Sequence, residues 1–265
     1  MNESLHLYLS GTEAMLRVRS GAPLRHETVD LAAWDWLPGS GSLQAPCAVP
    51  RGRWRAAPLH VYAGAGLCRF GVFDLPDGVK AADIDAVGRA KLAHELGLDA
   101  ARWRFTCDHD RRRGKLVAAA VRADAVAAAE AFALANKLQL VSVRPFGAVL
   151  ANLTEKALAG TGQRTLLAIE RDALNCFTFE GGEIVAAASL PHDGQPGALQ
   201  RAVQRLTLNQ DSAAAGELLI LAYRAVPWIL DGLMDRLLAP GDYLRHARHA
   251  DFRDLMFDKE SAACG

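Results

Sequence analysis

The chain has 265 residues, 51% hydrophobic and 23% charged, a composition typical of a globular protein and not of a disordered one. Thirty basic and thirty acidic side chains cancel to a net charge of zero, which argues against a nucleic-acid-binding protein. No stretch approaches the roughly 18–20 uninterrupted apolar residues that span a bilayer. The start, MNESLHLYLS, lacks the basic residues and apolar block of a secretory signal. We therefore expect a cytoplasmic protein with no transmembrane segment and no nucleic-acid partner.

The five cysteines are odd in number, widely spaced and never arranged as CxxC, which favours reduced thiols over disulfides or structural zinc. Two other groups carry side chains that could ligate a metal: Cys107-Asp108-His109-Asp110, and His246 with His249. The first lies in or beside an expected hairpin turn and the second in a polar tail, where polar residues are common without a metal. We predict no metal site.

The first elements predict a hairpin and then an irregular segment. Strands are expected at residues 5–9 and 14–19, separated by Ser10-Gly11-Thr12. Prolines and glycines prevent a long regular element at residues 33–57. A further strand is expected at residues 59–63.

Residues 67–143 predict six elements in the order strand, helix, strand, strand, helix, strand. The expected ranges are 67–73, 79–96, 103–106, 116–121, 124–136 and 138–143. This order is that of a ferredoxin-like unit.

After a connecting helix at residues 146–158, Gly160 and Gly162 mark the expected boundary between two lobes. Three strands joined by short turns are expected at 165–169, 174–179 and 183–190. A helix near 199–206, a buried strand at 217–223 and a helix that begins at Pro227 are expected after them. The first lobe shows the same order if the ferredoxin-like unit is an insertion. We expect lobes at 1–160 and 161–250, the insertion at about 67–143, and a tail at 251–265 that is either a last helix or a docking peptide.

Three features of the chain resemble one family of actin-like proteins. They are the insertion in the first lobe, the passage VRPFGAVLANL at 143–153, and the succession of TLLAIERDALNCFTFEGGEIV, a helix and ELLILAYRAVPWILDGLMDRL. The family includes the type IV pilus protein PilM, the cytoplasmic domain of the type II secretion protein GspL and the cell-division protein FtsA. The resemblance implies an α/β, actin-like, two-lobed ribonuclease-H-like fold with a ferredoxin-like insertion in the first lobe.

ATP-binding members of that family place a carboxylate and glycines in the hairpin turns of both lobes, where they meet Mg²⁺ and phosphate. In this chain Tyr8 or Leu9 occupies the carboxylate region of the first hairpin. In the second, Ala168 stands where an aspartate is expected and Glu170-Arg171 stand where glycine is expected. A third glycine pair is replaced by Ala222-Tyr223. These departures predict that ATP is not hydrolysed.

The sequence therefore favours a non-catalytic pseudo-ATPase without a cofactor. The resemblance implies a cytoplasmic adaptor, peripheral at the inner face of the membrane, that docks a short cytosolic segment of an inner-membrane assembly protein; homo-oligomerisation is left open. If nucleotide binding is retained, its residues would be Ser10, Gly11, Thr12, Glu170 and Arg171.

Two other hypotheses remain open at this stage. The first is a divergent ATP-dependent ATPase or phosphotransferase using ATP and Mg²⁺. It needs Ser10, Thr12, Glu170 and Asp172 to converge on one cleft. The second is an unrelated α+β domain, whose halves would lack the shared order of elements.

Overall fold

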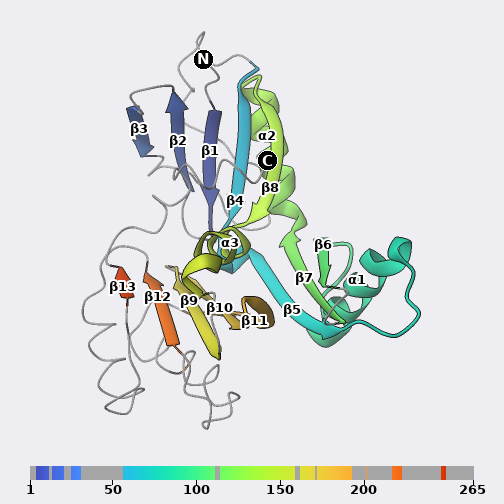
Figure 1. Cartoon of the computed structure of the whole chain (residues 1–265). Helices are drawn as coiled ribbons and strands as arrows, with labels where there is room; N and C mark the ends of the chain where they lie inside the picture. Colours follow the sequence, from blue (N-terminus) through green and yellow to red (C-terminus); the bar gives the residue numbers. More distant parts are fainter. Residues whose placement is uncertain are drawn as a thin grey trace.

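The computed structural model describes residues 4–11, 14–20, 25–30, 56–110, 114–158, 162–170, 172–192, 201, 217–222 and 246–248 (Figure 1). Several sequence predictions fall outside these ranges. They are the helix near 199–206 except for residue 201, the helix after Pro227, the tail at 251–265, and the residues Thr12, Arg171 and His249.

A five-stranded sheet in the order β3-β2-β1-β4-β8 forms the body of the first lobe (Figure 1). Its strands are β1 (Ser4–Leu9), β2 (Ala14–Ser20), β3 (Arg25–Asp30), β4 (Pro58–Ala63) and β8 (Gln139–Pro145). The β1–β2 and β2–β3 pairs are antiparallel, whereas β1–β4 and β4–β8 are parallel. Leu5, Leu7 and Leu9 of β1 are buried, and so are His6 and Tyr8 between them, so both faces of this central strand are covered.

The second lobe repeats this arrangement with the order β11-β10-β9-β12-β13. Its strands are β9 (Gln163–Ile169), β10 (Ala173–Glu180), β11 (Glu183–Pro191), β12 (Glu217–Ala222) and β13 (His246–Arg248). Again the first two pairs are antiparallel and the next two are parallel. Positive φ angles of 58° at Gly181 and 86° at Gly182 make the tight turn between β10 and β11. The shared strand order rules out the unrelated α+β domain.

The insertion projects from the first lobe (Figure 1). It contains β5 (Cys68–Asp74), the short 3-10 turn η2 (Ala81–Asp83), α1 (Ile84–Glu95), β6 (Trp103–Asp110) and β7 (Lys115–Arg122), with the sheet order β5-β7-β6. The six predicted elements occur in the predicted order. The last two, α2 (Ala123–Ala135) and β8, lie with the first lobe, because β8 pairs with β4 and α2 packs against both strands.

Helix α3 (Phe146–Leu158), predicted at these residues, leads from β8 towards the second lobe and packs against β8, β9 and β10. One hydrophobic core runs through both lobes. It includes Leu5 and Leu7 of the first sheet, Phe146 of α3, and Phe177 and Phe179 of β10. No helix in the described ranges is long and apolar enough to cross a bilayer. The lobes are thus joined by a shared core. This core fixes the turn after β1 and the turn after β9 at the junction between the lobes.

Candidate functional site

Two equivalent turns meet where the lobes join. One follows β1 at Ser10 and Gly11, and the other follows β9 and holds Glu170 and Asp172. A Cβ atom added at Gly11 would collide with the Asp172 carboxylate. Because β1 and β9 are the central strands of two sheets with the same topology, their ends lie at equivalent positions facing the junction. This is the place where the sequence analysis expects a nucleotide phosphate, if one is bound.

Glu170 is the centre of a hydrogen-bond network across the junction. Tyr8 Oη donates to Glu170 Oε2 at 2.5 Å, and the backbone N–H of Ala65 donates to the same oxygen at 2.8 Å. Asn175 Nδ2 lies 3.5 Å from Oε1, and Ser189 Oγ donates to Asn175 Oδ1 at 2.6 Å. Hydrogen bonds to an ionised carboxylate are roughly twice as strong as neutral ones. Since Tyr8 and Ala65 come from the first lobe and Glu170 from the second, this network ties the lobes together.

The short segment after β4 is shaped to receive these carboxylates. It contains the 3-10 turn η1 (Ala65–Leu67), which Gly64 precedes. A Cβ atom at Gly64 would lie 2.5 Å from Glu170 Oε2 and 2.8 Å from Tyr8 Oη, and one at Gly66 would lie 2.6 Å from Asp172 Oδ2. Side chains at these two positions would therefore push both acidic residues out of the junction. Nothing in the sequence alone indicated that these two glycines face acidic side chains.

The predicted nucleotide-binding residues are partly brought together. Ser10, Gly11 and Glu170 lie at the junction with Asp172, whereas Thr12 and Arg171 are outside the described residues. Ser10 and Glu170 are each 1% exposed, and Tyr8 is fully buried. In this closed arrangement these three side chains offer almost no surface to a ligand. The sequence indicated the replacements at Tyr8 and Glu170, but it indicated neither the contact between these two residues nor the part played by the Ala65 N–H.

The described cysteines are poor nucleophiles. Burial raises the pKa of the Cys68 thiol well above its usual range, and the negative charge of Glu170 acts in the same direction. Burial also raises the pKa of Cys176 to about 12, and burial together with Asp85 raises that of Cys107 to about 11. A thiol reacts as its thiolate, so these three groups are not suited to nucleophilic catalysis near neutral pH. Within the described ranges, no three His, Cys, Asp or Glu side chains cluster as metal ligands do.

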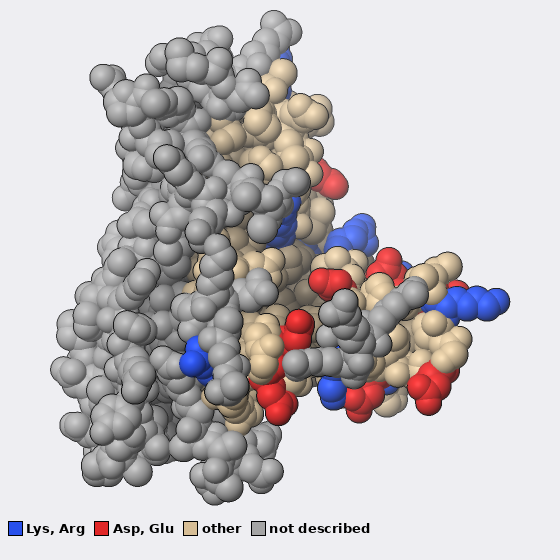
Figure 2. All heavy atoms as spheres, viewed as in Figure 1, with Lys and Arg blue, Asp and Glu red and all other residues tan. Residues whose placement is uncertain are grey.

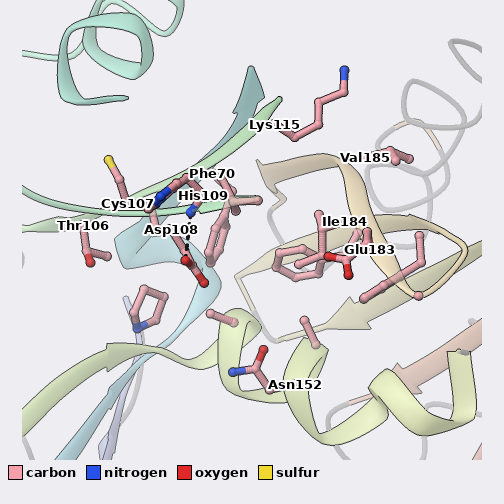
Figure 3. Close-up of a pocket in the computed structure, with 18 residues that line it drawn as sticks. Phe70, Thr106, Cys107, Asp108, His109, Lys115, Asn152, Glu183, Ile184 and Val185 are labelled. Atoms are coloured by element: carbon pink, nitrogen blue, oxygen red, sulfur yellow. Dashed lines mark hydrogen bonds between the residues drawn. The ribbon is translucent and has the colours of Figure 1, made fainter. Parts of the chain in front are cut away.

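A separate groove of about 390 Å³ lies between the insertion, α3 and the β10–β11 hairpin (Figure 3). Its apolar lining includes Phe70 from β5, Phe177 and Phe179 from β10, and Ile184 from β11. The Phe70 and Phe177 rings meet edge to face, with centroids 5.0 Å apart and an interplanar angle of 73°. Three elements that are distant in sequence therefore combine into one apolar surface, which the sequence analysis did not anticipate.

The polar residues along this groove have an acidic balance. Asp108, Lys115, Asn152 and Glu183 are among them (Figure 3). Lys115 Nζ is 2.6 Å from Asp74 Oδ1, so its charge is already matched by a carboxylate. Asp108 and Glu183 are exposed and form no ion pair within the part of the chain that the structure describes. The groove thus presents apolar surface next to two carboxylates that pair with no cation among the described residues.

No protein-family model matches the chain, and no curated protein sequence matches it either. Its structure is similar to a Bacteroides thetaiotaomicron protein described as having an actin-like ATPase fold and unknown function, with a TM-score of 0.54, 11% identity and 88% of each chain covered. It is also similar to the cytoplasmic domain of EpsL, an inner-membrane component of the Vibrio cholerae type II secretion system, with a TM-score of 0.51, 13% identity, and 83% of this chain and 82% of that one covered.

A third similar structure is the PilM–PilN type IV pilus biogenesis complex, with a TM-score of 0.57, 14% identity, and 83% of this chain and 81% of that one covered. In each of these three comparisons the match covers more than four-fifths of both chains. The chain therefore has the actin-like fold predicted from its sequence.

Proposed function

We propose that this protein is a non-catalytic, actin-like adaptor that docks a short cytosolic segment of an inner-membrane protein during pilus or type II secretion system assembly. The observation that carries the proposal is the closed junction. Glu170 and Tyr8 occupy the place between the lobes where an actin-like ATPase would need room for phosphate and Mg²⁺, and both are buried. A pseudo-ATPase keeps the fold and loses the reaction in this way.

The similar structures support an assembly role. One is the cytoplasmic domain of an inner-membrane component of a secretion system, and another is a pilus biogenesis protein in complex with a partner. An adaptor of this kind needs a surface for a partner segment, and the groove beside α3 is well suited to it.

The charge of the groove favours a basic partner segment. Cytosolic segments close to a membrane-spanning helix carry an excess of Lys and Arg. Asp108 and Glu183 would attract those residues, and the phenylalanine side chains of the groove would bind an apolar anchor next to them. The partner we propose is therefore a short segment with apolar anchors flanked by Lys or Arg.

The first test is calorimetric titration of the purified chain with ATP and Mg²⁺, followed by an assay for released phosphate. We expect no turnover, whether or not a nucleotide binds. The competing candidate is an ATPase or phosphotransferase, which is favoured by the convergence of Ser10, Glu170 and Asp172. Phosphate release that disappears in the Glu170→Gln variant would establish that candidate and refute the adaptor.

The second test uses labelled peptides that tile the cytosolic segments of the inner-membrane pilus and secretion proteins of the source organism. We expect one segment to bind, and the double variant Asp108→Lys/Glu183→Lys to weaken its binding by about tenfold. Glu130→Lys reverses an exposed charge on α2, outside the groove, and is the matched control. If no segment binds, or if all variants bind equally well, the proposed docking groove is refuted.

A further inference from the structure

A second cavity lies at the base of the insertion and is unrelated to the groove. It has a volume of about 370 Å³ and lies where β5 and β6 begin and where β7 passes into α2. Its lining consists of Gly66, Arg69, Arg102, Trp103, Arg122, Ala123 and Asp124. Figure 2 shows Lys and Arg side chains in the angle between the first lobe and the projecting insertion. Neither the proposed docking groove nor the closed junction accounts for this concentration of arginine.

The charges in this cavity do not cancel. Among the described side chains that line it, three guanidinium groups and one carboxylate leave two positive charges in excess. Arg122 and Asp124 form a two-pronged ion pair, in which Arg122 Nε donates to Asp124 Oδ1 at 3.0 Å and Arg122 Nη2 donates to Oδ2. No carboxylate among the described residues pairs with Arg69 or Arg102. The single acidic side chain of the cavity is thus fully engaged by one of the three arginines.

Arg69 is held in place without a counter-ion. Its Nη1 donates to the backbone oxygen of Cys68 at 2.6 Å, and its guanidinium carbon lies 5.5 Å from the centre of the Trp103 ring. Its side chain is partly buried. Burial is the main cause that lowers the pKa of Arg69 from its usual value; Cys68 acts against this shift and the positive charge of Arg122 adds to it. A partly buried cation next to a like charge is unfavourable unless an anion is present, so this arrangement favours a bound anion.

We propose that this cavity binds a phosphate group, either inorganic phosphate or the terminal phosphate of a phosphate monoester. The planar guanidinium fork matches the oxygens of a phosphate and can donate two hydrogen bonds to it. A phosphate dianion would match the two positive charges in excess, whereas one carboxylate would match only one. The cavity also has room for the substituent of a monoester, since its volume falls within the range of small-ligand sites.

The experiment is calorimetric titration of the full chain with inorganic phosphate at low ionic strength. We expect one site, and we expect binding to weaken at least about tenfold in Arg102→Met and in Arg69→Met. Arg102 is exposed, so its variant should fold even if the Arg69 variant does not. Arg104→Met, an exposed arginine on β6 outside the cavity, is the matched control and should bind phosphate as the parent does.

Vesicles distinguish the two sources of phosphate. Sedimentation with phosphatidylcholine vesicles containing phosphatidic acid, a monoester, is compared with vesicles containing phosphatidylglycerol, a diester. If the chain binds phosphatidic acid vesicles but not phosphatidylglycerol vesicles, and Arg102→Met abolishes that binding, the ligand is a lipid headgroup. If the chain binds inorganic phosphate through Arg102 but binds neither kind of vesicle, the ligand is a soluble phosphate. The proposal would be overturned if the chain bound neither phosphatidic acid vesicles nor inorganic phosphate at concentrations up to about 10 mM. Equal phosphate binding by the parent, Arg102→Met and Arg104→Met would also overturn it. The outcome is independent of whether a partner peptide binds in the groove.

Discussion

Removing the Tyr8 hydroxyl in Tyr8→Phe should lower the free energy of unfolding by about 2–3 kcal/mol. The hydroxyl donates to a buried carboxylate, and a hydrogen bond to a charged group contributes about 1.5–3 kcal/mol. The ring itself should stay in place, because it is fully buried and packs edge-on against Phe146 with a centroid distance of 5.3 Å and an interplanar angle of 77°. Glu170 would keep the hydrogen bond from the Ala65 N–H but would lose the one from Tyr8.

Tyr62→Phe is a closely matched control. Tyr62 lies opposite Tyr8 on the neighbouring strand and also packs edge-on against Phe146, with a centroid distance of 6.2 Å and an interplanar angle of 77°. Its hydroxyl is 3.0 Å from the ring nitrogen Nδ1 of His6, an interaction that contributes about 1 kcal/mol when the partner is neutral. Urea denaturation followed by circular dichroism measures both variants. If Tyr8→Phe costs no more than Tyr62→Phe, the junction is not closed by Glu170 in solution.

Two further predictions concern burial at other positions. Gly64→Ala should destabilise the fold by about 1–3 kcal/mol in the same denaturation assay. The backbone at Gly64, with φ −68° and ψ 171°, suits alanine, but the added Cβ would lie 2.5 Å from Glu170 Oε2. A neutral or stabilising result would contradict this close approach. In a Cys47→Ser/Cys264→Ser background at pH 8, Cys107 should react with a disulfide reagent about tenfold more slowly than a peptide thiol of pKa 9. A pKa of about 11 leaves about a hundredfold less thiolate, and the greater nucleophilicity of the more basic thiolate offsets about tenfold of that loss. The rate should rise as the pH approaches 11, and reaction at the peptide rate would show that the thiol is not buried.

Local patterns in the sequence determined most of the described elements. Apolar segments bounded by polar or glycine turns predicted β1 and the antiparallel strands of the second lobe, and one of the predicted turns is the observed one at Gly181-Gly182 between β10 and β11. The helix after Pro145 was also predicted at the observed residues. These features depend on neighbours a few residues apart, so a single sequence contains the necessary information. The three-residue strand β13 was missed, because so short a segment has no periodicity to detect.

Only the tertiary structure decided where some of these elements belong. The order of elements from residue 67 to residue 143 is the same whether the last strand joins the insertion or the first lobe. The pairing of β8 with β4 selects the lobe, and β4 is separated from β8 by the whole insertion. Pairing between distant strands depends on how complete sheets and helices pack, which the local pattern does not encode.

The candidate sites show the same division. The sequence alone indicated that Tyr8 and Glu170 replace residues of a nucleotide site, and it named Ser10 and Gly11 beside them. It could not show that Tyr8 donates to Glu170, 162 residues away, or that Ala65 donates to the same oxygen. The groove beside α3 and the arginine cavity each combine side chains from several elements in the same way. The residue types were visible in the sequence, but their chemistry depends on distances that only the packing of the two lobes and the insertion sets.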